Sequence, residues 1–230
     1  MCSIESCVGD FFHQSFSSVY AMDAQSAPSA SRDGLSNFWK QVLDSGEKSD
    51  VRFAVGHQYG DAKIFRAHKW ILTLHSDVFD RMFNGALPES GEDPIDIPEI
   101  MPVAFANMLS FVYTGVVDAD DLKSDNLFAT IYCADKYNLP RLLECCMNFV
   151  SSQLNAGNCL MYLDNIKCWK YACVADVMEK CLLLVDAFSD AILRSDEFSE
   201  TGVDTLHRIL QRSSLSPMKT KFTKLWKSGL

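Results

Sequence analysis

The chain has 230 residues and a mass of 25.8 kDa, enough for one large or two small domains with a sizeable core. Hydrophobic residues make up 48% and charged residues 22%, as in globular proteins, so a wholly disordered chain is excluded. The net charge of −9 argues against a protein that binds nucleic acid. Because neither a long apolar run nor a signal-peptide pattern is present, we expect a cytoplasmic protein without integral membrane contact.

The nine cysteines are an odd number, and none forms a CxxC pair or stands at zinc-finger spacing from a histidine pair. Most fall in apolar stretches, where a free cysteine behaves as a small hydrophobic residue. We therefore expect reduced, structural thiols, and neither a metal nor a cofactor.

The serine-rich residues 1–34 show no sustained apolar period and predict a flexible leader. An amphipathic helix follows, capped by Asp33 or Ser36 and ending near Gly46. Its apolar positions are Leu35, Phe38, Trp39, Val42 and Leu43. A lone surface helix would not carry two large aromatic residues, so this face packs either on a partner or within its own protomer.

A small sheet is predicted next. Residues 51–55 alternate as in a half-buried strand, and a turn-rich stretch leads to a returning strand over 62–66, which together form a β-hairpin. Residues 68–74 predict a short buried helix whose apolar residues are Trp70, Ile71, Leu72 and Leu74. Ser76 caps a further helix that ends near Gly85.

The rest of the chain is predicted to be mainly helical. One more short strand, at residues 95–97, stands between two prolines, which favours the edge of the sheet. Pro102 begins a helix that Gly115 ends. Further helices are predicted over residues 125–137 and 140–154, and only helices beyond Gly157. The expected fold class is α+β, a small sheet flanked by helices and followed by an all-α region.

Sequence patterns of catalysis are missing. The chain has no P-loop, no nucleophile elbow, no dinucleotide-binding glycine pattern and no HExxH. His68 and His75 have no carboxylate or thiol at a spacing that would complete a site, so we expect structural roles for them. The sequence therefore favours a binding protein over an enzyme.

Five sequence blocks in one order resemble the BTB (POZ) domain. They are Asp50-Val51-Arg52-Phe53, residues 65–72, Ser76-Asp77-Val78-Phe79, Met82-Phe83 and Phe111-Val112-Tyr113-Thr114-Gly115. Residues 155–160 and 193–198 are similar to parts of a BACK domain. Residues 38–41, 82–85 and 129–134 resemble the BTB–BACK–PHR subgroup of cullin-3 adaptors, although the sequence lacks the PHR domain.

The resemblance implies a domain plan and a dimer. After the leader, it implies a BTB domain over residues 35–154, a complete or partial BACK domain over 155–212 and a basic tail over 213–230. Relatives pair two-fold through their first helix, which places Leu35, Phe38, Trp39 and Val42 at a homodimer interface. Asp50 and Lys69 match a charged-pocket pair near that interface.

The resemblance also implies a function: recruiting a protein substrate, whose identity the sequence leaves open, to a cullin-3 RING ubiquitin ligase. Leu87 and Glu89 stand where relatives carry an apolar-x-Glu contact to the cullin. Tyr113 matches a cullin-facing position, with a buried core tyrosine as the alternative. The rival functions are a scaffold without ligase activity and a truncated partner that dimerises with related BTB proteins and blocks them.

The basic tail allows two interpretations. Residues 205–230 contain six Lys or Arg and no acidic residue, whereas the rest of the chain is acidic. Phe222, Leu225 and Trp226 are interleaved with the lysines. Such a tail can contact a membrane or an acidic partner, or fold back on its own acidic body, which is the interpretation we favour.

Overall fold

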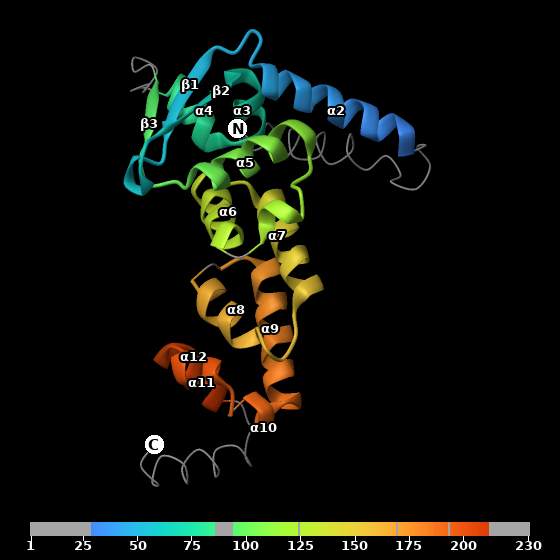
Figure 1. The fold of residues 1–230 in the computed structure, drawn as a ribbon, viewed down its shortest axis with the longest axis vertical. Helices are drawn as coiled ribbons and strands as arrows, with labels where there is room; N and C mark the ends of the chain where they lie inside the picture. The colour runs from blue at the N-terminus through green and yellow to red at the C-terminus, as the bar shows by residue number, and fades with distance from the viewer. Residues whose placement is uncertain (1–28, 86–93, 124, 169, 193, 212–230) are drawn as a thin grey trace, which may run out of the picture.

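The computed structural model describes residues 29–85, 94–123, 125–168, 170–192 and 194–211, and runs from an end that contains a sheet to an all-helical end (Figure 1). The strands are β1 (Val51–Val55), β2 (Lys63–Ala67) and β3 (Ile95–Ile97). The helices around them are α2 (Ser29–Ser45), α3 (Lys69–His75), α4 (Asp77–Asn84), α5 (Pro102–Thr114), α6 (Asp125–Lys136) and α7 (Pro140–Gln153). The helical end comprises α8 (Cys159–Ile166), α9 (Ala172–Ala187), α10 (Ser189–Ile192), α11 (Asp196–Glu200) and α12 (Val203–Gln211), and short 3-10 turns lie at His57–Tyr59 and Asp120–Leu122. The predicted α+β class is confirmed.

The sheet has three strands in the order β2-β1-β3. The β1–β2 hairpin is antiparallel, as predicted, and pairs Phe53 with Phe65. β3 lies at an edge, also as predicted, but it runs parallel to β1 and pairs Ile95 with Phe53. The chain reaches this parallel position by passing through α3 and α4 after β2, as a crossover connection requires.

The core under the sheet is built around Phe53. Alternation along β1 turns this side chain toward the helices, where it is fully buried. Its ring contacts the rings of Phe79, Phe83 and Phe105 at centroid distances of 6.0, 6.4 and 5.2 Å. Burying one such aromatic side chain stabilises the fold by about 1.5–3 kcal/mol, so these contacts hold α4 and α5 against the sheet.

Helices α4 and α5 begin, and α5 ends, at residues whose local chemistry predicts these boundaries. The Ser76 hydroxyl accepts a hydrogen bond from the Phe79 N–H at 3.3 Å and so caps α4. Pro102 occupies the first turn of α5. Gly115 ends α5 with a φ of 75°, a left-handed conformation that a residue with a side chain would adopt only under strain.

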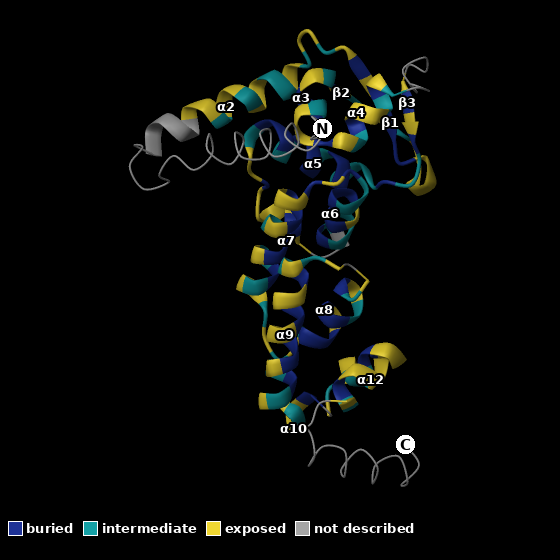
Figure 2. Cartoon of the chain, turned by 180° about the vertical axis from the view of Figure 1, so that it is seen from behind, coloured by how far each residue is buried: buried dark blue, intermediate teal, exposed yellow. Residues whose placement is uncertain are grey.

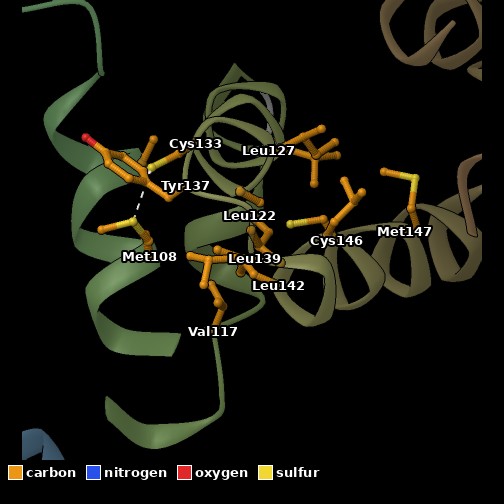
Figure 3. Packing of buried hydrophobic residues seen from close by; sticks show 14 of the residues in the cluster. Met108, Val117, Leu122, Leu127, Cys133, Tyr137, Leu139, Leu142, Cys146 and Met147 are labelled. Atoms are coloured by element: carbon orange, nitrogen blue, oxygen red, sulfur yellow. Dashed lines mark hydrogen bonds between the residues drawn. The ribbon is translucent and has the colours of Figure 1, made fainter. Parts of the chain in front are cut away.

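A second part of the core lies between α5, α6 and α7 (Figure 3). The Cys133 thiol contacts the Met108 sulfur at 3.6 Å, and Cys146 is fully buried nearby. Burial raises the pKa of the Cys146 thiol to about 12, so this group stays protonated at neutral pH. The seven cysteines within the described ranges are free thiols, in line with the sequence interpretation; Cys2 and Cys7 lie outside those ranges.

One carboxylate links α8 to the start of α12 in the helical end. Asp164 of α8 accepts hydrogen bonds from the Gly202 N–H at 2.8 Å, from the Thr205 hydroxyl and from the Lys167 ammonium at 3.2 Å. Burial alone would raise the pKa of Asp164, but these three donors together lower it below the ordinary value. The first turn of α12 is thereby held on α8.

Two expectations about helices are wrong. The first helix begins at Ser29 and not at a cap near Asp33 or Ser36, because the apolar pattern marks only the turns that pack, so the predicted leader includes the start of α2. The short helix α3 is not buried all round, since it packs on the core through Ile71 and Leu72 only. Trp70 and Leu74 are exposed on its other side, as the exposed turns of α3 in Figure 2 illustrate.

Candidate protein-interaction surface

Helices α2 and α3 present an exposed apolar surface. Leu35, Phe38, Trp70 and Leu74 are 60%, 54%, 54% and 61% exposed. Trp39 connects the two helices, because its ring lies edge-on to Phe38 at 5.4 Å and to Trp70 at 6.3 Å. We call Leu35, Phe38, Trp39, Trp70 and Leu74 the α2–α3 face. Contiguous exposed apolar side chains of this size are typical of an interaction site.

The predicted interface residues on α2 divide into two kinds. Leu35 and Phe38 project into solvent and are available to a partner. Trp39 and Val42 are half-buried and pack against the protein's own core, where α2 lies on α5. Trp39 and Val42 therefore fit the interpretation in which this helix packs within its own protomer, whereas Leu35 and Phe38 stay predicted contacts to a partner. Trp70 and Leu74 were expected inside a buried helix and not on an interaction surface, although their spacing of four residues places them on one side of α3.

Asp50 and Lys69 are adjacent, but the structure joins them differently from the predicted charged pair. The Asp50 carboxylate accepts a hydrogen bond from the backbone N–H of Lys69 at 2.7 Å, which satisfies a donor at the start of α3. The Lys69 ammonium instead lies over the Phe83 ring, 5.5 Å from its centroid. Asp50 is exposed, so its contribution is a helix cap at the base of the α2–α3 face.

Tyr113 is buried, with 6% of its surface exposed, and its hydroxyl is used within the protomer. The hydroxyl accepts a hydrogen bond from the His68 backbone N–H at 2.9 Å and lies 2.8 Å from His68 Nδ1. Burial raises the pKa of Tyr113 to about 12. The structure therefore supports the core alternative for Tyr113 over a direct cullin contact.

His68 joins three segments through one ring. Its Nε2 lies 2.9 Å from the Glu47 carbonyl oxygen, which can only accept, so Nε2 carries the hydrogen. Nδ1, the other nitrogen of the ring, lies 2.8 Å from the Tyr113 hydroxyl. Glu47 follows α2, His68 precedes α3 and Tyr113 lies in the last turn of α5. This network fixes how α2 and α3 sit beside each other and so shapes the α2–α3 face.

The predicted cullin contact residues Leu87 and Glu89 lie outside the described residues. Their segment, 86–93, connects α4 to β3. The basic tail over 213–230 also lies outside the described residues.

Within the described ranges, no three His, Cys, Asp or Glu side chains are grouped so that they could hold a metal ion. Among the described helices, none combines the length and the apolar character needed to cross a membrane.

Comparison with known proteins gives one family. A model of the BTB/POZ domain matches residues 39–154. BTB/POZ domain-containing protein 3 of Homo sapiens is 35% identical over 168 residues, 73% of this chain and 31% of the relative. BTB/POZ domain-containing protein 6 of Xenopus laevis is 36% identical over 73% of this chain and 30% of its own length, and protein 6-A of Danio rerio is 33% identical over 76% and 31%. The chain spans about a third of the length of these relatives.

Proposed function

Because this chain belongs to the BTB/POZ domain family, we propose that it is a homodimeric adaptor that recruits a protein substrate to a cullin-3 ubiquitin ligase. BTB domains are protein-interaction modules, so the proposed role is binding, and the chemistry is left to the ligase. The helices α8 to α12 are proposed as a BACK-like region that extends the adaptor beyond the BTB domain.

The observation that carries the proposal is the α2–α3 face. Large aromatic side chains supply most of the energy in protein interfaces, and Phe38 and Trp70 stand exposed on adjacent helices. A two-fold axis would bring the same residues of two copies together and bury them. The Asp50 cap and the His68 network hold both helices in place before a partner arrives, which lowers the ordering cost of association.

The cullin part of the proposal depends on the loop between α4 and β3. Leu87 would fill an apolar pocket of the cullin, and Glu89 would pair with a polar or basic group at its rim. Pro88 restricts the backbone between them, so less conformational entropy is lost on binding. Tyr113 is buried and bonded to His68, so the proposal assigns it no contact with the cullin.

The experiment is a calorimetric titration of the chain with the N-terminal region of cullin-3. We expect binding by the wild type, and we expect Leu87→Asp to weaken it by about 2 kcal/mol or more, because a charge would enter an apolar pocket. Glu89→Ala should cost about 1 kcal/mol, since a charge at the rim acts partly through solvent. Neither residue belongs to the α2–α3 face, so both variants should keep the mass of the wild type in light scattering.

The outcomes separate the candidate functions. No binding by the wild type at tens of micromolar would reject the adaptor and leave a scaffold. Equal binding by all three proteins would keep the adaptor but reject this loop as its contact. Binding of cullin-3 together with a loss of substrate ubiquitination when the chain is overexpressed would identify a blocker of related BTB proteins.

A further inference from the structure

The helical end carries a second exposed apolar surface, away from the α2–α3 face. Leu183 and Phe188 are 55% and 50% exposed, and Ala187 and Ala191 beside them are exposed as well. The spacing of Leu183 and Ala187 places them on one side of α9, and Ala191 follows on α10. We call these four residues the α9–α10 face. Figure 2 shows exposed positions continuing along α9 to α10.

The segment of the chain that carries and follows this face is acidic. Residues 172–204 contain two basic and eight acidic residues, the latter being Asp176, Glu179, Asp186, Asp190, Asp196, Glu197, Glu200 and Asp204. A segment or partner that covers the apolar side chains therefore binds most favourably if it also carries positive charge.

The chain itself contains a segment of that chemistry. Residues 212–230 hold one arginine, four lysines and no acidic residue. Phe222, Leu225 and Trp226 follow helical spacing, and lysines stand on both sides of them. The segment begins directly after α12, which Asp164 fastens to α8, so it is tethered to the domain that carries the α9–α10 face. Tethering over a short connection makes docking intramolecular, at an effective concentration near millimolar.

We propose that residues 212–230 dock on the α9–α10 face of the same chain. Phe222, Leu225 and Trp226 cover Leu183 and Phe188, and the lysines lie toward the acidic residues around them. Burial of the apolar side chains supplies the energy, and the charges select the basic segment over an acidic or neutral one. A partner that uses the α9–α10 face must then displace the tail first. The proposal depends neither on dimerisation nor on cullin-3.

The test is limited trypsin digestion of the full chain, followed by intact-mass spectrometry. Trypsin cuts after Lys219, Lys221, Lys224 and Lys227, and cleavage requires the undocked tail. We expect the tail to be cut several-fold more slowly than a synthetic peptide of residues 212–230. The double variant Leu183→Asp/Phe188→Asp should raise the cleavage rate about tenfold, because the apolar contact is lost.

Two further variants separate docking from misfolding. Phe222→Ala/Trp226→Ala leaves the described helices untouched and should raise the rate as the face variant does. Val203→Asp is the matched control: Val203 is 81% exposed at the start of α12, the helix that precedes the tail, and it is not part of the α9–α10 face, so the rate should stay at the wild-type value. Equal rates in all the proteins and the free peptide would overturn the proposal.

Other occupants give different results. Carbodiimide cross-links between tail lysines and acids of α9 to α11 should form within one chain in a mixture of ¹⁵N-labelled and unlabelled protein. Cross-links mainly between labelled and unlabelled chains would mean that a second copy is the occupant. The protein can also be sedimented with phosphatidylserine vesicles. If the tail is protected from trypsin only when the vesicles are present, the occupant of the tail is a membrane. Either result would overturn intramolecular docking.

Discussion

His68 and Tyr113 form a buried polar contact beneath the α2–α3 face. Both side chains are buried, and each donor and acceptor that they share is matched. Buried polar groups stabilise a fold when all of them are satisfied, and they are costly when one loses its partner. The network therefore makes the position of α2 sensitive to a single hydroxyl group.

Replacing Tyr113 by Phe removes that hydroxyl. We expect Tyr113→Phe to lower the free energy of unfolding by about 1–3 kcal/mol, because the His68 N–H and Nδ1 both lose their partner in a buried site. Tyr59→Phe is the matched control, since Tyr59 is exposed and its hydroxyl makes one long bond of 3.3 Å to Glu99; we expect less than about 0.5 kcal/mol. Urea unfolding at one protein concentration measures both, and equal losses would refute the role of the network.

Single residues differ in how far the sequence predicts them. Ser76 and Gly115 are signals of local backbone geometry, so a short stretch of sequence suffices to identify their roles. Asp50 and Lys69 were predicted to be close but as an ion pair, because the sequence does not show that a backbone N–H at the start of α3 is the nearer donor. The Glu47 carbonyl in the His68 network has no sequence signal at all, since every residue has one.

At the scale of the elements, the sequence predicts most helices and the hairpin. It predicts only in part which of their sides stay exposed. Periodicity identifies α5 and α7, whose apolar sides are covered along their length. It fails for α3, because two turns of mostly apolar residues do not reveal which side meets the core. The exposed side of α3, with Trp70 and Leu74, is decided by the packing of Ile71 and Leu72 and so could not be predicted locally.

The attachment of α12 to α8 should depend on pH. The donors around Asp164 lower its pKa below the ordinary value of 3.8. The ionised carboxylate therefore contributes its full stability at pH values above 3.8, and this contribution is lost as the pH falls through the lower pKa of the folded state. We expect Asp164→Asn to cost about 1–2 kcal/mol at pH 7 and to lose less stability than the wild type between about pH 5 and pH 3.

Hydrogen exchange of the α12 amides, followed across this pH range, measures the attachment directly. Asp120→Asn is the control: the pKa of Asp120 is also lowered, by Lys123, but this pair is exposed and lies far along the chain from α12. It should leave exchange in α12 unchanged. Identical α12 exchange in the wild type and Asp164→Asn at every pH would contradict the role of Asp164.

At the scale of the whole molecule, we expect a dimer. Light scattering at micromolar concentration should give about twice 25.8 kDa. Phe38→Asp should give a monomer, because association would bury an unpaired carboxylate, which costs several kcal/mol. Phe38 is a better choice than Trp39, since Trp39 also packs on the protein's own core and its replacement would disturb the fold.

Tyr59→Asp is the control for this variant. Tyr59 is 57% exposed, close to Phe38 in accessibility, but it lies in the turn between β1 and β2. The control should remain a dimer with the wild-type mass. A wild type that is monomeric throughout, or a Phe38→Asp variant with unchanged mass, would show that the α2–α3 face is not the interface.

The parallel pairing of β3 has a consequence for the order in which the chain folds. The β1–β2 hairpin closes a loop of about eight residues, whereas pairing Phe53 with Ile95 closes a loop of about 40 residues. Contacts between distant parts of a chain form late, because the entropy of loop closure is lost before they contribute stability. The hairpin can thus form early, while β3 has only three residues and pairs after the intervening chain has folded and α4 has packed on Phe53. The last strand to join the sheet is then the one that directly follows the segment containing Leu87 and Glu89.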